Sequence, residues 1–523
     1  MIARGVDLLA VGCDALEYAD EPALFDLLSY ADPDIVYVLR EGADVRVASR
    51  IRRAFDGPVI APGGPATCRT ETVAGITVVF ADSTDRLENR ASADVPPDAD
   101  YVVCDDLAPT TDRVALEASL EGLERIGEYQ RESAAETVFC TGSFPAGYDY
   151  VWHRELEEGP VRLPVRGLGP IRRSGGAELA RLRLGADGSV SVSSVPADRF
   201  GLGALSGVGP TTAERLRKRG YDSRRAVADA SVADLRSIRG IGESTAVEMQ
   251  RSARAMAESR VIRRTADPVA PVGNDPLFVD IETDGLHPTV IPLIGVFDPD
   301  SGEYVDFVDS DPSRTDPGTA TRAFIDWLAA THDDPTLAAW NGYGFDFPHI
   351  ERFVARYAPE YREYWTEHVS TVDPYDWAVR CDNAVLPGRT NRLEDVAAAL
   401  GCERAADAEA IDGRTFAKQV RRLIEAPDSE DPTSSVGEPS PTADERCRPM
   451  DDTQLESEPR IDWERVRRYC EADVRELAAV YDALVSADPA NESVAMRSPG
   501  ERGGTTDDRT DSTTQTGLAD FDS

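Results

Sequence analysis

The feature that most limits the fold of this chain is the segment Leu277–Thr283, in which Asp280 and Glu282 alternate with apolar residues. Side chains two positions apart on a β-strand face the same side, so we expect these two carboxylates to point toward one region. Neighbouring carboxylates repel each other unless a cation lies between them. Oxygen ligands suit Mg²⁺ or Mn²⁺, so the strand predicts a divalent metal site. Taken alone, the pattern also fits an edge strand with two solvated acids.

Two later segments place further acidic residues on predicted helices. A glycine-containing turn over Asn341–Phe345 follows a short apolar run, and Asp346 begins a predicted helix. An aspartate at this position is also typical of an N-terminal helix cap. Near the end of the chain Trp463–Ser486 has helical periodicity, and within it Tyr469 and Asp473 lie one turn apart on the same face.

In this order the three segments resemble the exonuclease motifs of DnaQ-like proteins and of family B polymerase proofreading domains. The tyrosine of the third motif makes this the DEDDy variant of the four-acid family. Within the superfamily, the segment Asn391–Ala397 is most similar to the YprB-type ribonuclease H-like branch. The positions that match the motifs are Asp280, Glu282, Asn341, Asp346, Tyr469 and Asp473.

The resemblance implies a ribonuclease H-like mixed sheet flanked by helices. It also implies a 3′→5′ exonuclease that hydrolyses phosphodiester bonds with two Mg²⁺ or Mn²⁺ ions as cofactors. Asp280 would contact both ions, Glu282 and Asp473 one of them, and Asp346 mainly the second. Tyr469 would orient the attacking water or help to deprotonate it, and positioning is the larger part because an unperturbed phenol has a pKa near ~10.

Two more residues near the second motif have expected roles. Asn341 is expected to contact the nucleic acid. His349 follows Asp346 on the same predicted helix, but it does not occupy the position of the histidine in the DEDDh variant, so a packing or surface role is expected. A different class of function remains open, namely a nucleic-acid-binding scaffold that retains the nuclease fold only for structure. The presence of all four acids and the tyrosine disfavours it.

A basic helical segment precedes this region. Two glycine-containing turns each lead into a predicted helix, and both resemble helix-hairpin-helix units, in which backbone N–H groups at a helix start approach a phosphate. Residues 206–264 contain 13 basic and 7 acidic residues in a chain whose net charge is −39. This local excess predicts contacts with a nucleic-acid backbone, and a dimerisation or spacer domain is the alternative. The residues assigned to nucleic-acid binding here are Gly207, Gly209, Lys218, Arg219, Gly240 and Gly242.

The overall charge would ordinarily argue against so acidic a partner. Only Lys218 and Lys418 are lysines, and the dense carboxylates resemble the surface of a protein from an extreme halophile. Nucleic acid therefore remains the expected partner: the hairpins favour DNA and the YprB-type likeness favours RNA, with DNA preferred, while a helicase or repair partner is left open. The 8 cysteines form no Cys-x-x-Cys pair, so neither zinc nor an iron–sulfur cluster is indicated. We find no apolar run of membrane-spanning length and expect a soluble, cytoplasmic protein.

The first 200 residues alternate short apolar runs with amphipathic stretches, which predicts a separate α/β domain. Its strand order faintly resembles calcineurin-like metallophosphoesterases, with Gly12-Cys13-Asp14 at the first metal motif. Glu41-Gly42 and Gly63–Ala66 replace the next two motifs, and His153 is the only histidine before residue 200, so such an enzyme would be catalytically dead. An unrelated α/β domain, for example a decayed RecB-like nuclease, is equally compatible with the sequence.

The predicted organisation is an α/β multidomain chain with an all-α module in the middle. A helix is expected over Arg113–Ser133 in the first domain. Two stretches rich in Ser, Pro, Thr, Asp and Glu are predicted to be disordered because they contain too little apolar surface to offset chain entropy. The predicted boundaries are 1–200 for the N-terminal domain, 201–262 for the tandem hairpins, 263–275 for a linker, 276–487 for the exonuclease-like domain with a disordered insertion at 427–459, and 488–523 for a disordered acidic tail.

Overall fold

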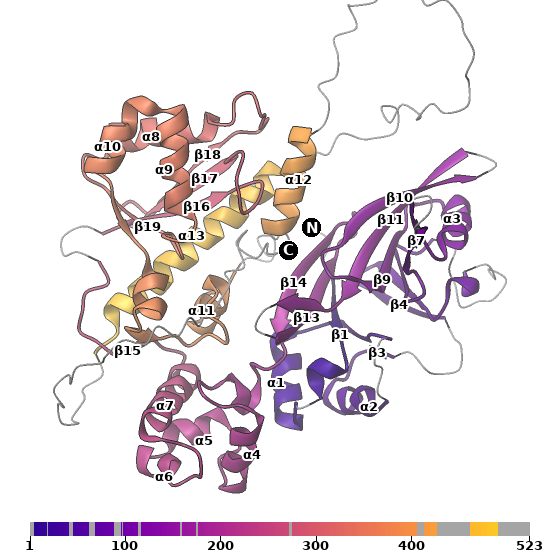
Figure 1. Ribbon diagram of the computed structural model, residues 1–523, viewed down its shortest axis with the longest axis horizontal. Helices are drawn as coiled ribbons and strands as arrows, with labels where there is room; N and C mark the ends of the chain where they lie inside the picture. Colours follow the sequence, from indigo (N-terminus) through magenta and orange to yellow (C-terminus); the bar gives the residue numbers. More distant parts are fainter. Residues whose placement is uncertain are drawn as a thin grey trace, which may run out of the picture.

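The structure is a computed structural model in which an N-terminal α/β region, a small helical module and a C-terminal α/β region lie next to one another (Figure 1). The predicted disordered insertion at 427–459 and all but the first two residues of the predicted tail at 488–523 lie outside the described residues. The structure describes residues 5–17, 19–40, 45–61, 68–87, 96, 98–112, 117–156, 159–173, 176–270, 275–404, 413–425 and 461–489.

The N-terminal region consists of two sheets packed face to face. Both faces of strand β1 are apolar and buried, which suits a position between two layers. Val6, Leu8 and Ala10 lie between the sheets, and Leu9 and Val11 pack against helices. The first sheet has the order β12-β13-β1-β2-β3 with β14 on β13, and the second has the order β10-β11-β9-β6-β5-β4. The strands are β1 (Val6–Val11), β2 (Ile35–Val38), β3 (Val59–Ile60), β4 (Arg69–Val73), β5 (Ile76–Ala81), β6 (Tyr101–Cys104), β9 (Val138–Pro145), β10 (Asp149–Leu156), β11 (Gly159–Gly169), β12 (Ile171–Arg173), β13 (Gly176–Leu184) and β14 (Val190–Pro196).

Helices cover both outer faces, which gives a helix–sheet–sheet–helix sandwich and confirms the predicted α/β class. Helices α1 (Glu21–Ala31) and α2 (Val45–Ala54) cover the first sheet, and α3 (Leu123–Glu132) covers the second. The helix predicted over Arg113–Ser133 was wrong over Glu117–Leu120, which is strand β8 and pairs with β7 (Pro109–Asp112), because extended pairing competes with helix in this short segment. Residues 113–116 lie outside the described residues.

The helical module has its own apolar core, in which Leu216, Leu235 and Met249 are fully buried. Helices begin directly after both predicted glycine turns. The helices of the module are η3 (Gly201–Ala204), α4 (Pro210–Lys218), α5 (Arg224–Asp229), α6 (Val232–Arg236) and α7 (Glu243–Glu258). The segment that follows the module packs against the C-terminal region. Arg263 and Val269, inside the predicted linker, are both buried, and Val269 is part of the core of the C-terminal region. Strand β15 (Ile262–Arg263) pairs with β21 (Ala384–Val385).

The C-terminal region has a mixed five-stranded sheet of order β18-β17-β16-β19-β20, between α8 and α9 on one face and α11 and α13 on the other. Strand β16 is antiparallel to β17 and parallel to β19. Among the described helices none combines the length and the apolar character needed to cross a bilayer. The elements are β16 (Leu277–Glu282), β17 (Leu293–Asp298), β18 (Glu303–Val308), α8 (Thr319–Thr331), β19 (Thr336–Ala338), α9 (Asp346–Tyr357), η4 (Pro359–Tyr361), α10 (Arg362–Glu367), β20 (Ser370–Val372), η5 (Asp376–Arg380), α11 (Leu393–Ala399), α12 (Gly413–Glu425) and α13 (Trp463–Ser486).

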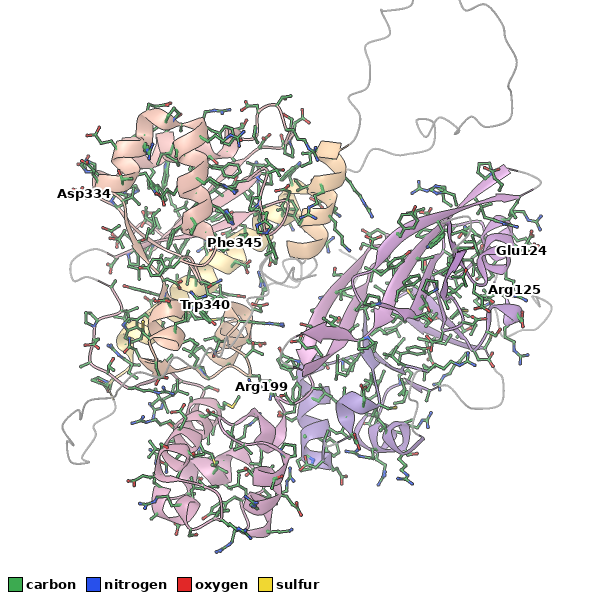
Figure 2. The ribbon with its side chains drawn as sticks, viewed as in Figure 1. Glu124, Arg125, Arg199, Asp334, Trp340 and Phe345 are labelled. Atoms are coloured by element: carbon green, nitrogen blue, oxygen red, sulfur yellow. The ribbon has the colours of Figure 1, made fainter. Side chains whose placement is uncertain are left out.

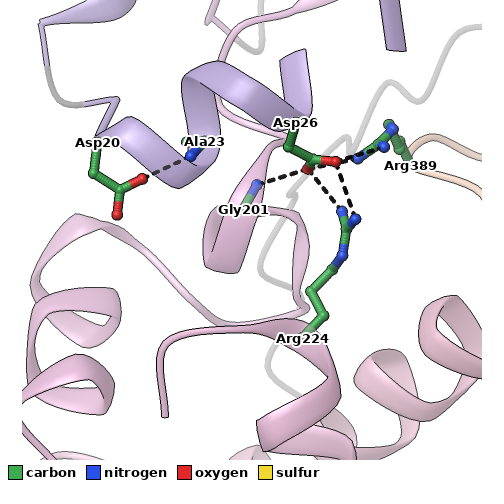
Figure 3. Close-up of polar contacts among 6 residues, drawn as sticks. All are labelled: Asp20, Ala23, Asp26, Gly201, Arg224 and Arg389. Atoms are coloured by element: carbon green, nitrogen blue, oxygen red, sulfur yellow. Dashed lines mark hydrogen bonds and ion pairs between the residues drawn. The ribbon is translucent and has the colours of Figure 1, made fainter. Parts of the chain in front are cut away.

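One carboxylate joins the three regions. Asp26 on α1 accepts paired hydrogen bonds from Arg224 of the helical module, at 2.9 and 3.0 Å, and from Arg389 of the C-terminal region, both at 2.8 Å (Figure 3). The backbone N–H of Gly201 donates a further bond of 2.9 Å to it. Fork-like guanidinium–carboxylate pairs fix geometry as well as charge, so Asp26 contributes to how the regions meet, together with contacts such as Arg217–Asp20 and Arg392–Ser194.

Candidate metal centre and nucleic-acid interface

Strand alternation places the two carboxylates of β16 where a metal ligand set forms. Leu277, Val279 and Ile281 pack toward α8 and α9, which leaves Asp280 and Glu282 on the opposite face, toward α13. Helix α13 brings Asp473 to them. Carboxylate oxygens of Asp280, Glu282 and Asp473 all lie within 4.8 Å of one another. In the described part of the chain this is the only group of three or more His, Cys, Asp or Glu side chains so arranged.

Helix α13 approaches the sheet closely because the strand opposite Asp280 carries a glycine. Gly295 pairs with Asp280 in the register of β17, and a Cβ atom on Gly295 would lie 2.5 Å from the Cys470 Sγ atom. The thiol of Cys470 in turn lies 3.7 Å from an oxygen of Asp280. Any larger residue at 295 would push α13, and Asp473 with it, away from the β16 carboxylates.

The electrostatics of this group favour a bound cation. Burial raises the pKa of Asp280 well above its usual range, and the negative charges of Asp473, Glu282 and Asp346 raise it further. Burial also raises the pKa of Asp473, although the Arg404 guanidinium opposes that shift. Buried carboxylates that repel one another are stabilised by a divalent ion, so this donor set fits Mg²⁺ or Mn²⁺.

Asp346 lies at the start of α9, which follows a turn bracketed by Trp340 and Phe345 (Figure 2). It is outside the group of three, but its charge contributes to the raised pKa of Asp280. Its own side chain is 3% exposed, and burial raises its pKa to about 7. A cap role was the alternative for Asp346, but the N-cap position of α9 is Phe345, and Asp346 is the first residue of the helix.

Tyr469 lies one turn before Asp473 on α13. Its side chain makes a hydrogen bond to Asp473, which lowers the pKa of that carboxyl, while burial raises the pKa of the phenol well above its ordinary value. The hydroxyl therefore stays protonated at neutral pH, which favours the positioning role over proton abstraction. Arg404 was not anticipated: it pairs with Asp473, donates to the backbone oxygen of Tyr469 at 3.3 Å and lies 4.9 Å from that ring. No motif marks it, because it reaches the site through a loop.

The turn of the second motif is held by a buried aspartate that sequence inspection also missed. Asp373, 2% exposed, accepts hydrogen bonds from the backbone N–H groups of Asn341 at 3.0 Å and Tyr343 at 3.1 Å. Asn341 adopts a left-handed backbone with φ of 60°, a conformation that asparagine tolerates well. Its side-chain oxygen accepts a bond of 2.8 Å from Arg380. The only sequence signal is an aspartate directly after a short strand.

His349 lies on α9, where its ring packs edge-on against Phe345 at 4.7 Å. Burial lowers its pKa to about 4, and the charges of Arg352 and His287 act in the same direction. A ring that stays neutral and packs against an aromatic neighbour agrees with the packing role expected for it.

The two hairpins of the helical module present open backbone at their helix starts. Gly207 and Gly240 have φ of 74° and 90°, which the tight turns require. Gly209 and Gly242 are the N-cap residues directly before α4 and α7, and a Cβ atom on either would meet no other heavy atom within 4 Å. Thr211 and Ser244 in the first turns are exposed, so a phosphate can approach these helix starts, although Pro210 itself has no N–H to donate.

The basic residues of this module divide into two groups. Lys218 and Arg219 are exposed at the end of α4, although Lys218 also pairs with Glu214 at 2.6 Å. Others serve the fold: Arg224 binds Asp26, and Arg215 donates a bond of 2.9 Å to the backbone oxygen of Arg239 in the second hairpin. The positive charge counted in the sequence is thus only partly available to a ligand.

The N-terminal region has a cavity of about 830 Å³ at the carboxyl ends of β1, β2 and β6. Gly12, Cys13 and Asp14 line it, together with arginines and Asp105. Residues 41–42 and 63–66, the other positions compared with metallophosphoesterases, lie outside the described residues, and His153 lies on strand β10, away from the cavity lining. The role of this region thus stays a hypothesis.

Comparison with known proteins agrees with two of these regions. Residues 277–431 match the family model described as the ribonuclease H superfamily, and residues 201–255 match the SAM-like helix-hairpin-helix tandem. The DNA repair and recombination protein RadA from two strains of Halobacterium salinarum is 46% identical over 54 residues, which are 10% of this chain and 16% of the relative. The chain thus spans about a sixth of the length of these curated relatives.

Solved structures of Escherichia coli exonuclease I also match. One, in complex with a dT13 oligonucleotide, is 21% identical and covers 28% of this chain and 40% of that chain, with a TM-score of 0.20. Another, described as suggesting how processivity is achieved, has the same identity and TM-score and covers 39% of that chain. On the evidence of the family models and the fold, this chain carries a ribonuclease H superfamily domain preceded by a tandem helix-hairpin-helix domain.

Proposed function

We propose that the protein is a metal-dependent 3′→5′ exonuclease of the DEDDy type that acts on nucleic acid, with DNA preferred over RNA. The observation that carries this proposal is the convergence of Asp280, Glu282 and Asp473 within 4.8 Å on a ribonuclease H superfamily domain. Asp280, Glu282 and Asp473 would hold one Mg²⁺ or Mn²⁺ ion, and Asp346 would help to hold a second. Such ions supply Lewis acidity toward the attacking and departing oxygens of a phosphodiester.

The side chains around the ligands perform the remaining tasks. Tyr469, protonated and hydrogen-bonded to Asp473, orients the attacking water. Arg404 holds Asp473 and the ring of Tyr469 in place, so it acts as a positioning residue. Asn341, whose backbone N–H donates to Asp373 and whose side-chain oxygen accepts from Arg380, would contact the strand end beside Asp346.

The tandem hairpins bind the backbone of the substrate. The open helix starts after Gly209 and Gly242 bind backbone phosphates, and Lys218 and Arg219 add charge at the end of α4. A match to relatives named for DNA repair and recombination favours DNA and a role in repair. The acidic, lysine-poor composition and the origin of those relatives favour a halophilic source and the cytoplasm.

The test is degradation of 3′-labelled and 5′-labelled single strands of DNA and of RNA with Mg²⁺ or Mn²⁺, at low salt and in molar KCl. We expect the wild type to release 5′-mononucleotides from 3′ ends and Asp280→Ala to be inactive. Degradation that survives Asp280→Ala would remove these acids from the mechanism. Metal-independent binding without any hydrolysis by the wild type would favour the alternative, a nucleic-acid-binding scaffold.

A further inference from the structure

A second, basic cavity lies on the ribonuclease H-like domain, between helix α9 and the loop that follows β16. It has a volume of about 410 Å³, and its lining includes Arg314, Arg352 and Arg356 beside the aromatic residues Phe353 and Tyr357. Among the described residues that line it there is no carboxylate. In a chain with a net charge of −39, a described lining with three arginines and no carboxylate is a local concentration of positive charge.

Two of the arginines that line this cavity are spaced one turn apart on helix α9. Arg352 and Arg356 lie one turn apart on an exposed face, while Phe353 on the adjacent face is 3% exposed and anchors the helix in the core. The Arg352 guanidinium donates a bond of 2.7 Å to the backbone oxygen of Pro288, and the Arg356 guanidinium lies 5.1 Å from the ring of Tyr357. A guanidinium has five N–H donors, so these contacts orient both groups and leave donors for a ligand.

Two segments link the cavity to the metal centre, namely helix α9 and the loop that follows β16. The loop that leaves β16 after Glu282 is pinned by Asp284, whose carboxylate accepts bonds from the N–H of Thr289 at 2.8 Å and from its hydroxyl at 2.7 Å. Thr289 then lines the cavity. On the other side, α9 begins at Asp346, and Arg352 and Arg356 follow at about 9 and 15 Å along the helix, given a rise of ~1.5 Å per residue.

Two acidic residues on the loops beside the cavity are bound by other groups. Asp316, on the same loop as Arg314, is held by the guanidinium of Arg322 at 2.8 and 2.7 Å. The Asp284 carboxylate is 4% exposed and is committed to the loop bonds just described. An anion in the cavity therefore meets the arginines without a competing carboxylate in the lining.

We propose that this cavity binds a backbone phosphate of the substrate strand, about two to four nucleotides from the scissile bond, given the spacing of phosphates along a strand and the rise of α9. The inference rests on the proposed exonuclease function and adds the path of the strand. Arginine pairs with phosphate through two parallel hydrogen bonds, which suits Arg352 and Arg356 side by side. The strand would run from the carboxylates, along α9, to this cavity.

The experiment compares the full chain with the double variant Arg352→Gln/Arg356→Gln. The matched control is Arg362→Gln, which removes an exposed positive charge on α10 outside the cavity lining. Substrates are a dinucleotide, too short to reach the cavity, and a dodecanucleotide. For the double variant we expect the ratio of kcat/KM for the long substrate to that for the short one to fall on the order of 100-fold, through KM, if each of the two phosphate contacts contributes as a charge-assisted hydrogen bond does.

Binding of the dodecanucleotide, measured by fluorescence anisotropy on an Asp280→Asn background, provides a second readout. Loss of two phosphate contacts should reduce the slope of log K against log salt by about 1.4, at ~0.7 per contact for a single strand. If the double variant matches Arg362→Gln in both the length ratio and the salt slope, the cavity does not lie on the strand path. If instead the wild type hydrolyses neither substrate, the exonuclease proposal fails, and a change in the salt slope would still locate a nucleic-acid contact at the cavity.

Discussion

The strand-end carboxylates of the two α/β regions have opposite surroundings. In the N-terminal region Asp105 follows β6 and accepts hydrogen bonds from the Tyr37 phenol at 2.6 Å and from the N–H groups of Gly142 at 3.0 Å and Arg40 at 3.3 Å. Burial raises the pKa of Asp105, and these bonds oppose the shift. In the C-terminal region Asp280 faces two other carboxylates instead.

This difference distinguishes a carboxylate with a structural role from one that could bind a metal ion. A buried carboxylate that is supplied with donors holds loops together and has no need of an ion. Carboxylates that face one another keep their charges only with a cation between them. The comparison is informative because both sites lie at the ends of strands in α/β folds, so location by itself does not tell them apart.

The largest expected effect is the difference in exonuclease rate between the variants Glu282→Gln and Asp105→Asn. Loss of one metal ligand should lower the exonuclease rate on the order of 10³-fold, equivalent to ~4 kcal/mol of activation free energy. Asp105→Asn should leave the rate within a few-fold and instead lower the free energy of unfolding by about 1–3 kcal/mol, because hydrogen bonds to a charged acceptor are lost. Steady-state kinetics and urea unfolding measure the two. A folded Asp105→Asn protein without activity would break the comparison.

The second largest effect should be a loss of stability on removing Asp26, which connects the three regions. Asp26→Ala leaves Arg224 and Arg389 without their carboxylate, which should cost about 3 kcal/mol of stability for a largely buried pair. Limited proteolysis and urea unfolding can measure this, with Glu21→Gln, exposed on the same helix, as the control. Equal behaviour of the two variants would show that the regions are held together without this carboxylate.

The same ion pairs predict a dependence on pH. Burial would raise the pKa of Asp26, but hydrogen bonds from Arg389 and Gly201 and the charge of Arg224 outweigh burial and lower it. A lowered folded-state pKa means that the stabilisation is present above the unfolded value of ~3.9 and is lost as the pH falls below it. We expect the wild type, but not Asp26→Ala, to lose this contribution in acid.

A somewhat smaller effect is expected from the metal ion. At a concentration about 100 times its Kd, Mn²⁺ should stabilise the wild type by about 2.7 kcal/mol. Asp105→Asn should retain this stabilisation and Glu282→Gln should lose most of it, because only the second change removes a ligand. Thermal unfolding with and without EDTA is the measurement. Equal metal stabilisation of both variants would place the ion elsewhere.

The smallest effect should come from Tyr469→Phe. The ring that Arg404 contacts remains, and only the hydroxyl bonded to Asp473 is lost. We expect kcat to fall about 10-fold, or ~1.4 kcal/mol, with little change in KM. The pH profile of kcat should keep its shape, because the pKa of the phenol is raised far above neutral pH. A loss as large as that of Glu282→Gln would instead make the phenol part of the proton transfer.

Local patterns in the sequence were enough to predict the elements that carry the chemistry. The strand Leu277–Glu282, the helix that begins at Asp346 and the helix Trp463–Ser486 were all predicted, because alternation and helical periodicity are local properties. The glycine turns of the hairpins were predicted for the same reason. The helix expected over Arg113–Ser133 failed where pairing with a neighbouring strand decided the backbone.

The packing of the elements against one another decides which of these side chains meet. It brought Asp473 to Asp280 and Glu282 because Gly295 lets α13 approach the sheet, and it left Asp346 at the edge of the group. It also supplied Arg404, Asp373 and the arginine cavity, none of which a motif marks. The physical reason is that these contacts join residues far apart in the chain, and their distances depend on packing that no local pattern encodes.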